Sequence, residues 1–252
     1  MDVTLDSIRD VRLYQSRTGY RFSVDSLLLY EFVDLKNVSN IADLGAGSGI
    51  VGILLAKRYP QAKVTLFEIQ DSLIALAQKN VALNNLRGRV TTVKCDISEL
   101  SRRNARFGSY DLVVSNPPFR RLKSGRINLE EERAIARHEI KLGLSEFIDA
   151  AARILRARGR LCLIYHPWRL AELVERLKKR GMEPKRIRFV HSRISSEAKM
   201  VLLEAVKTGK TGMRVENPFF IYDEKGQYTE EMGRVYKPEV GIGYGSEEEF
   251  CK

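Results

Sequence analysis

The sequence is poor in cysteine and histidine, with three of each in 252 residues. The cysteines, Cys95, Cys162 and Cys251, are far apart and form no CxxC pair, so they predict neither a disulfide framework nor a zinc site. His191 falls on a predicted late strand without evident metal-ligating neighbours. We therefore expect no metal, and thiols in a reducing compartment, the cytoplasm.

Long hydrophobic runs are also missing. No apolar stretch approaches the roughly 20 residues that a membrane-spanning helix needs. The first residues, Met1 to Asp6, lack the basic and apolar regions of a signal peptide. We expect no membrane partner and favour a monomer. The length predicts one domain over residues 1–252, with a lead-in at 1–35 and a C-terminal extension at 208–252.

Acidic residues are outnumbered by basic ones, 32 to 43, which leaves a net charge of +11. One interpretation is a polyanionic partner, because lysine and arginine release condensed counterions when they bind phosphates. The other is a surface rich in charges of both signs, of the kind found in thermophilic proteins. Charge alone does not separate these two interpretations.

Strand-like apolar segments alternate with helical ones along most of the chain. Strands are predicted at 41–44, 63–68, 89–94, 110–115 and 160–165, with a late antiparallel pair at 185–191 and 199–206 and a further piece at 219–222. Helices are predicted at 24–32, 48–59, 72–84, 139–155 and 168–180. This order predicts an α/β, Rossmann-like fold: a mostly parallel seven-stranded sheet with helices on both faces and an antiparallel last strand pair. Ligands of such folds bind beyond the carboxyl ends of the strands.

A glycine-rich loop follows the first predicted strand and reads Asp43-Leu44-Gly45-Ala46-Gly47-Ser48-Gly49. Glycines allow a sharp turn into a helix and a close approach of the backbone to a ligand. A dinucleotide fingerprint needs a small residue at position 50, where Ile50 stands. The spacing therefore favours a ligand without a pyrophosphate, although a glycine triplet alone can equally be a plain strand-to-helix turn.

Acidic residues stand at the ends of the next two predicted strands. Glu68, followed by Ile69, is placed to bind both hydroxyls of a ribose, and Asp96 with Ile97 to bind an adenine. Either acid alone could simply cap a helix. Together with Asp43 and the glycine loop, they predict S-adenosyl-L-methionine as cofactor, with its amino-acid end on the loop.

The fourth predicted strand ends in Asn116-Pro117-Pro118-Phe119, for which we predict a catalytic role. Two prolines make the loop stiff and hold Asn116 extended. The Asn116 side-chain oxygen and the Pro117 carbonyl can each accept a hydrogen bond from an exocyclic amine, which aims its lone pair at a methyl donor. Phe119 can stack on a planar base turned out of its helix. Taken alone, Asn-Pro is more often an ordinary turn.

These motifs resemble those of class I S-adenosylmethionine-dependent amino-methyltransferases. Two flanks, Gly19-Tyr20-Arg21-Phe22-Ser23-Val24-Asp25 and Ala136-Arg137-His138-Glu139, are similar to the tRNA1(Val) (adenine-37-N6)-methyltransferase family. The resemblance covers nearly the whole chain and implies a tRNA substrate. It also implies that Phe22 and Asp25 cover the cofactor. Phe119 departs from the family pattern, which often has tyrosine there. The complete predicted cofactor site is Phe22, Asp25, Asp43, Gly45, Ala46, Gly47, Gly49, Glu68, Ile69, Asp96, Ile97 and Asn116.

Basic residues cluster just after this loop, at Arg120, Arg121, Lys123 and Arg126. We predict that they hold RNA phosphates while Phe119 holds the base. A solvated surface loop is the alternative. His138 could contact RNA or only cap a helix. For Trp168 we favour packing over stacking on RNA.

Three other functions remain open. The same motif suits an enzyme that methylates the glutamine amide of a protein, but only 44 residues precede Gly45, too few for the extra helical domain such enzymes usually carry. A DNA adenine methyltransferase commonly adds a target-recognition region, for which this chain has no obvious space. A non-catalytic RNA-binding module is disfavoured by the intact Asn116-Pro117-Pro118.

Overall fold

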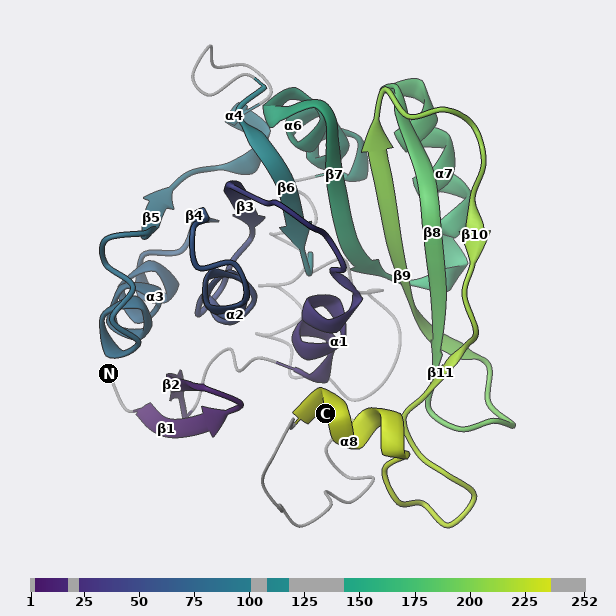
Figure 1. Cartoon of the computed structure of the whole chain (residues 1–252), viewed down its shortest axis with the longest axis horizontal. Coiled ribbons are helices and arrows are strands. Elements are labelled where there is room, and N and C mark those ends of the chain that lie inside the picture. Colours follow the sequence, from purple (N-terminus) through teal and green to yellow (C-terminus); the bar gives the residue numbers. More distant parts are fainter. Residues whose placement is uncertain (1–2, 18–22, 101–107, 118–142, 237–252) are drawn as a thin grey trace, which may run out of the picture.

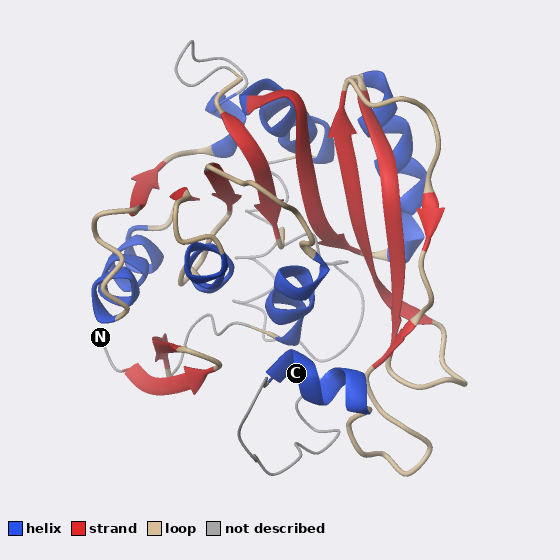
Figure 2. Cartoon of the chain, viewed as in Figure 1, coloured by secondary structure: helices blue, strands red, loops and turns tan. Residues whose placement is uncertain are grey.

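The computed structural model describes residues 3–17, 23–100, 108–117 and 143–236, and Figure 1 shows their arrangement. One large mixed sheet runs through this part of the chain, with helices on both of its faces (Figure 2).

The main sheet has nine strands, seven of which form its body. Their order is β5 (Val90–Lys94), β4 (Lys63–Glu68), β3 (Asn40–Leu44), β6 (Tyr110–Ser115), β7 (Leu155–Tyr165), β9 (Ala198–Lys207) and β8 (Met182–His191). Neighbouring strands are parallel from β5 to β7, and β9 is antiparallel to both β7 and β8. Two-residue strands β10 (Arg214–Val215) and β11 (Phe219–Phe220) add to β8. The predicted fold class is confirmed.

Two hydrophobic cores lie on opposite faces of the sheet. Side chains of a strand alternate between the faces, so Ile41 lies in one core and Ala42 in the other. The first core packs under α1 (Val24–Phe32), α2 (Ile50–Arg58) and part of α3 (Asp71–Leu83). The second packs under α6 (Leu144–Ile154), α7 (Leu170–Lys179) and the short α4 (Ile97–Leu100).

The segment before α1 forms an antiparallel hairpin of β1 (Val3–Ile8) and β2 (Val11–Ser16). It docks on α3 through two buried asparagines. The side chain of Asn80 bonds to both backbone groups of Tyr14, and that of Asn84 to both of Arg12. The two amide side chains thus make the hydrogen bonds that a neighbouring strand would make to the backbone groups on the free edge of β2.

The chain after β9 also packs against the main body, and its last described element, α8 (Glu230–Tyr236), contacts α1. Arg9 of the hairpin donates hydrogen bonds to the carbonyls of Arg234 and Val235 in α8. Tyr228 stacks between Tyr222 and Tyr236, with ring centroids 5.2 and 5.6 Å apart. The division into a domain with two extensions stays a prediction.

Several predicted boundaries are wrong. The helix predicted to end at Leu155 ends at Ile154, and β7 starts immediately at Leu155, not at Arg160. A β-bulge between β6 and β7 accommodates the extra residues, which helical periodicity cannot reveal. The helix predicted from Trp168 begins with a 3₁₀ turn at Pro167–Arg169. Helices α4 and α8 and strand β10 were not predicted, because two- to seven-residue elements carry little periodicity.

Among the described helices, none combines the length and the apolar character needed to cross a membrane.

Candidate active site at the carboxyl edge of the sheet

The register of the parallel strands brings the predicted site residues to one edge. Leu44 of β3 lies beside Phe67 of β4, and Glu68 lies beside Lys94 of β5. On the other side of β3, Asp43 pairs with Val114 of β6. The segments that follow β3, β4, β5 and β6 therefore begin close together, as the sequence predicts for a ligand site.

The glycine loop is anchored to the end of β4. The amides of Gly45 and Ala46 both donate to the carbonyl of Phe67, at 2.9 and 3.0 Å. Gly45, Gly47 and Gly49 all have positive φ, between 56° and 88°. Only glycine adopts this backbone region without strain, so the triplet is explained by the shape of the loop. The loop then enters α2, whose first amides point toward the same edge.

Glu68 has a structural role that was not predicted, and its contact with a ribose stays a prediction. Its Oε2 accepts a hydrogen bond of 3.0 Å from Gly47, and its Oε1 accepts from Ile69 and Gln70, at 2.8 and 3.0 Å. The residue is 7% exposed. Glu68 therefore holds the glycine loop against the end of β4. Each carboxylate oxygen has two lone pairs, so Oε2 can still accept from a ligand hydroxyl.

Asp96 follows β5, and its Oδ1 caps α4 by accepting from the amide of Ser98 at 2.9 Å. Its Oδ2 accepts no hydrogen bond from the described part of the chain and is available to a ligand donor. Ile97, the next residue, packs on the second core. Capping and ligand binding are thus compatible here, because they use different oxygens.

Asp43 lies beneath the glycine loop and is 2% exposed. Its Oδ2 accepts a hydrogen bond of 2.9 Å from the amide of Gly52 in the first turn of α2. Burial is the main cause that raises the pKa of Asp43 to about 7, and the nearby Glu68 carboxylate raises it further. The geometry makes Asp43 a support of the loop, and its direct contact with a cofactor stays a prediction.

Asn116 extends from the end of β6 and is held from α1. Its Nδ2 donates to Ser26 Oγ at 3.3 Å, and Oδ1 accepts no hydrogen bond from the described part of the chain, so it is open to a substrate donor. The preceding Ser115 donates from Oγ to the carbonyl of Leu44 at 2.6 Å, which ties the end of β6 to the end of β3. Asp25 is next to Ser26 in the first turn of α1. Pro117 follows Asn116 and is half-buried.

Other predicted site residues lie outside the described part of the chain. These are Phe22, Pro118, Phe119, Arg120, Arg121, Lys123, Arg126 and His138. Their assignments stay predictions.

Three supporting residues were missed from the sequence. Ser26 orients Asn116, and its only signal was its place beside Asp25. Gly52 allows α2 to lie close to β4, because a Cβ there would come within 2.2 Å of Leu66 Cδ2. Asn80 donates to the carbonyl of Ser48 at 3.0 Å and so connects the N-terminal hairpin to the glycine loop. A glycine and an asparagine inside helices, where neither is favoured, were the available signals.

A metal-binding cluster of histidine, cysteine, aspartate or glutamate is not found among the residues that the structure describes. Cys95 and Cys162 are buried, and neither forms a disulfide within the described part of the chain. Burial raises the pKa of Cys162 far above its ordinary value, so this thiol stays protonated and belongs to the core.

Known proteins are similar to this chain in sequence. Residues 21–178 match the family model of the methyltransferase small domain. A tRNA1(Val) (adenine(37)-N6)-methyltransferase of Shewanella sp. (strain W3-18-1) is 30% identical over 225 residues, 85% of this chain and 89% of the relative. One of the same name from Porphyromonas gingivalis is 29% identical and covers 94% of this chain and 95% of its own.

The fold agrees with these matches. The crystal structure of a predicted O-methyltransferase from Agrobacterium tumefaciens superposes with a TM-score of 0.67 at 23% identity, over 86% of this chain and all of that one. The family resemblance predicted from the two flanking motifs is confirmed. The chain belongs to the methyltransferase small domain family.

Proposed function

We propose that this protein transfers a methyl group from S-adenosyl-L-methionine to N6 of an adenine in RNA, and that this RNA is a tRNA. The observation that carries the proposal is the position of Asn116 at the carboxyl end of β6. Its amide nitrogen donates to Ser26, and no described residue donates to its oxygen. The names of the relatives support adenine N6 as the methylated atom and tRNA as the substrate.

The described residues fit the cofactor. Positive φ at three loop glycines brings their backbone close to a ligand. Glu68 Oε2 retains a lone pair for a ribose hydroxyl, and Asp96 Oδ2 is open to an adenine amine. Oε1 of Glu68 already accepts two amides, which leaves one oxygen for the ribose. When bound, S-adenosylmethionine supplies an activated methyl group on a sulfonium.

The chain's own residues then align the amine. Asn116 Oδ1 and the carbonyl of Pro117 accept one N–H each, which localises the nitrogen lone pair and directs it away from the ring. No strong base is needed before attack, because the amine proton becomes acidic only once the nitrogen carries the methyl group. Correct placement of reacting atoms accounts for a large share of such a rate enhancement. Ser26 contributes by holding the Asn116 side chain in place.

Glutamine methylation is the runner-up, because an amide NH2 offers the same two donors to Asn116 and Pro117. The net charge of +11 favours a phosphate-bearing substrate over a protein loop. A cytoplasmic location follows from the proposed tRNA substrate.

The test is to incubate the purified protein with labelled cofactor and unfractionated tRNA, digest the RNA and identify the nucleoside by mass spectrometry. N6-methyladenosine is the expected product. A 2′-O-methyl nucleoside or 5-methylcytidine in its place would overturn the proposal. Transfer of the labelled methyl group to a glutamine of a protein would instead support glutamine methylation.

A further inference from the structure

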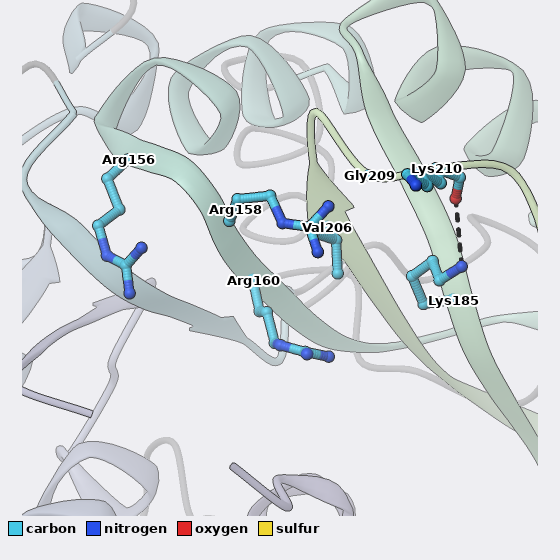
Figure 3. Close-up of a pocket in the computed structure, with 7 residues that line it drawn as sticks. All are labelled: Arg156, Arg158, Arg160, Lys185, Val206, Gly209 and Lys210. Carbon is cyan, nitrogen blue, oxygen red and sulfur yellow. Dashed lines mark hydrogen bonds between the residues drawn. The ribbon is translucent and has the colours of Figure 1, made fainter. Parts of the chain in front are cut away.

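A basic pocket lies at the opposite end of the strands from Asn116. Its cavity volume is about 480 Å³, and its charged lining is Arg156, Arg158, Arg160, Lys185 and Lys210, without an acidic residue (Figure 3). The three arginines come from the start of β7, Lys185 from the start of β8, and Lys210 from the loop after β9. Cations this close together repel each other unless acidic side chains or a bound anion neutralise them.

Part of this charge is neutralised inside the protein and part is not. Arg156 pairs with Asp111, and Arg160 pairs with the buried Glu204. Lys185 Nζ donates to the carbonyl of Lys210 at 3.1 Å, which fixes the loop but leaves both positive charges unpaired. Arg158 and Lys210 have no side-chain hydrogen bond or ion pair within the described part of the chain. Three charges are therefore available to a ligand.

The backbone at Arg158 is strained in a way that shapes the pocket. Its φ is +65°, a left-handed conformation that costs an arginine free energy. At the next residue, Gly159, a Cβ would lie 2.9 Å from the carbonyl oxygen of Arg156 and 3.0 Å from that of Tyr110. The bulge between β6 and β7 falls at this point. Bulges redirect side chains, and here Arg158 reaches toward Val206, which also lines the pocket (Figure 3).

We propose that this pocket binds phosphate groups of the RNA substrate at nucleotides away from the methylated base. The inference rests on the proposed RNA substrate. Arginine and lysine in a concave site are the usual partners of phosphate oxygens. The pocket is distinct from the catalytic edge: Leu163 pairs with Ser115 and lies five positions after Arg158, which at about 3.3 Å per residue is roughly 15–20 Å along the sheet. A folded RNA can span this distance, whereas a single nucleotide bound at Asn116 cannot.

The test compares two variants that lose the same charge. The pocket variant carries Arg158→Asn, Lys185→Gln and Lys210→Gln; asparagine tolerates the left-handed backbone at 158. The control variant carries Lys79→Gln, Arg87→Gln and Lys225→Gln, three exposed cations elsewhere on the surface. Wild type and both variants are titrated with unfractionated tRNA over a series of salt concentrations, and with inorganic tripolyphosphate. Cofactor affinity and thermal unfolding serve as controls for the fold.

The pocket variant should bind tRNA about tenfold more weakly than the control variant and show a log–log salt slope lower by about 0.7–0.9 for each phosphate that it no longer binds. It should also fail to bind tripolyphosphate. If both variants bind tRNA and tripolyphosphate alike, the pocket is not a phosphate site. If the pocket variant loses only tripolyphosphate binding and still binds tRNA like the control, the pocket binds a free phosphate compound. The proposal that it binds RNA phosphates would then be wrong. These experiments measure binding and not methylation. They therefore test the pocket even if the protein turns out not to methylate adenine N6.

Discussion

The side-chain nitrogen of Asn116 donates a hydrogen bond to the hydroxyl of Ser26, 3.3 Å away. Asn116 follows β6 and Ser26 lies in the first turn of α1, so the contact joins residues 90 positions apart. Ser26 is 1% exposed and its own amide donates to the carbonyl of Ser23, so the hydroxyl is held in a fixed place. The contact holds the Asn116 amide with its nitrogen toward α1, and its oxygen then lies on the side open to a substrate amine.

Ser26→Ala should therefore slow methylation without weakening cofactor binding. The methyl side chain fills nearly the same volume, so the fold should be retained. A hydrogen bond of this kind contributes about 0.5–1.5 kcal/mol, which predicts a fall in kcat of about two- to tenfold. Single-turnover rates and calorimetric titration of the cofactor measure the two effects separately. An unchanged kcat would remove Ser26 from the positioning of Asn116.

Asn116→Ala should have a larger effect of the same kind. It removes the acceptor that acts as the methyl moves, so the loss should appear in turnover and not in ground-state binding. We expect methylation at least about a hundredfold slower, with cofactor affinity within about twofold of wild type. Asn116→Asp keeps an acceptor and serves as the comparison. Loss of cofactor affinity that matches the loss of rate would contradict this role.

Glu68→Ala should weaken cofactor binding, because the ribose and the glycine loop lose the same acceptor. Hydrogen bonds to a charged group are worth about 2 kcal/mol or more, so the Kd should rise at least about thirtyfold. Asp71→Ala is the matched control: it removes an acid nearby in the chain whose side chain is 78% exposed and paired with Lys94. Equal affinities of the two variants would exclude Glu68 from the cofactor site.

Asn80→Ala should destabilise the protein by about 3 kcal/mol, because its side chain makes three hydrogen bonds in a fully buried position. The amide of Tyr14 would lose its acceptor, and Ser48 of the glycine loop would lose a donor. Urea denaturation measures the change. Lys79→Ala, an exposed position on the same helix, should change stability by less than about 0.5 kcal/mol. Equal effects of the two substitutions would show that the hairpin is held by other contacts.

Asp43 should make stability depend on pH. Its pKa is about 7 in the folded protein against 3.8 for the ordinary side chain, so the folded state holds its proton more tightly. The tighter binding of this proton adds to the free energy of unfolding. The added stability is complete below about pH 4, is lost as the pH rises to about 7, and amounts to about 4 kcal/mol at most. Asp43→Asn keeps an oxygen acceptor for Gly52 without a titrating group. The variant should gain stability relative to wild type between about pH 4.5 and about pH 8, and parallel pH profiles in urea denaturation would contradict the shift.

The sequence alone determined the fold class and the gathering of the candidate site residues at one edge of the sheet. Apolar segments placed four of the five parallel strands to within a residue, because buried parallel strands and amphipathic helices have distinct patterns. The glycine loop, Glu68, Asp96 and Asn116 could be found because each follows a predicted strand, and the carboxyl ends of parallel strands share one edge.

Only the tertiary structure decided how these residues are held. That Glu68 accepts from Gly47, that Asn116 donates to Ser26, and that Asn80 bridges the hairpin and the glycine loop all depend on contacts between distant segments. The same holds for the basic pocket, whose five cations come from three separate stretches of chain. Local periodicity carries no information about such pairs. Their proximity is set by the register of the sheet and by helix packing and, for the basic pocket, also by the bulge between β6 and β7.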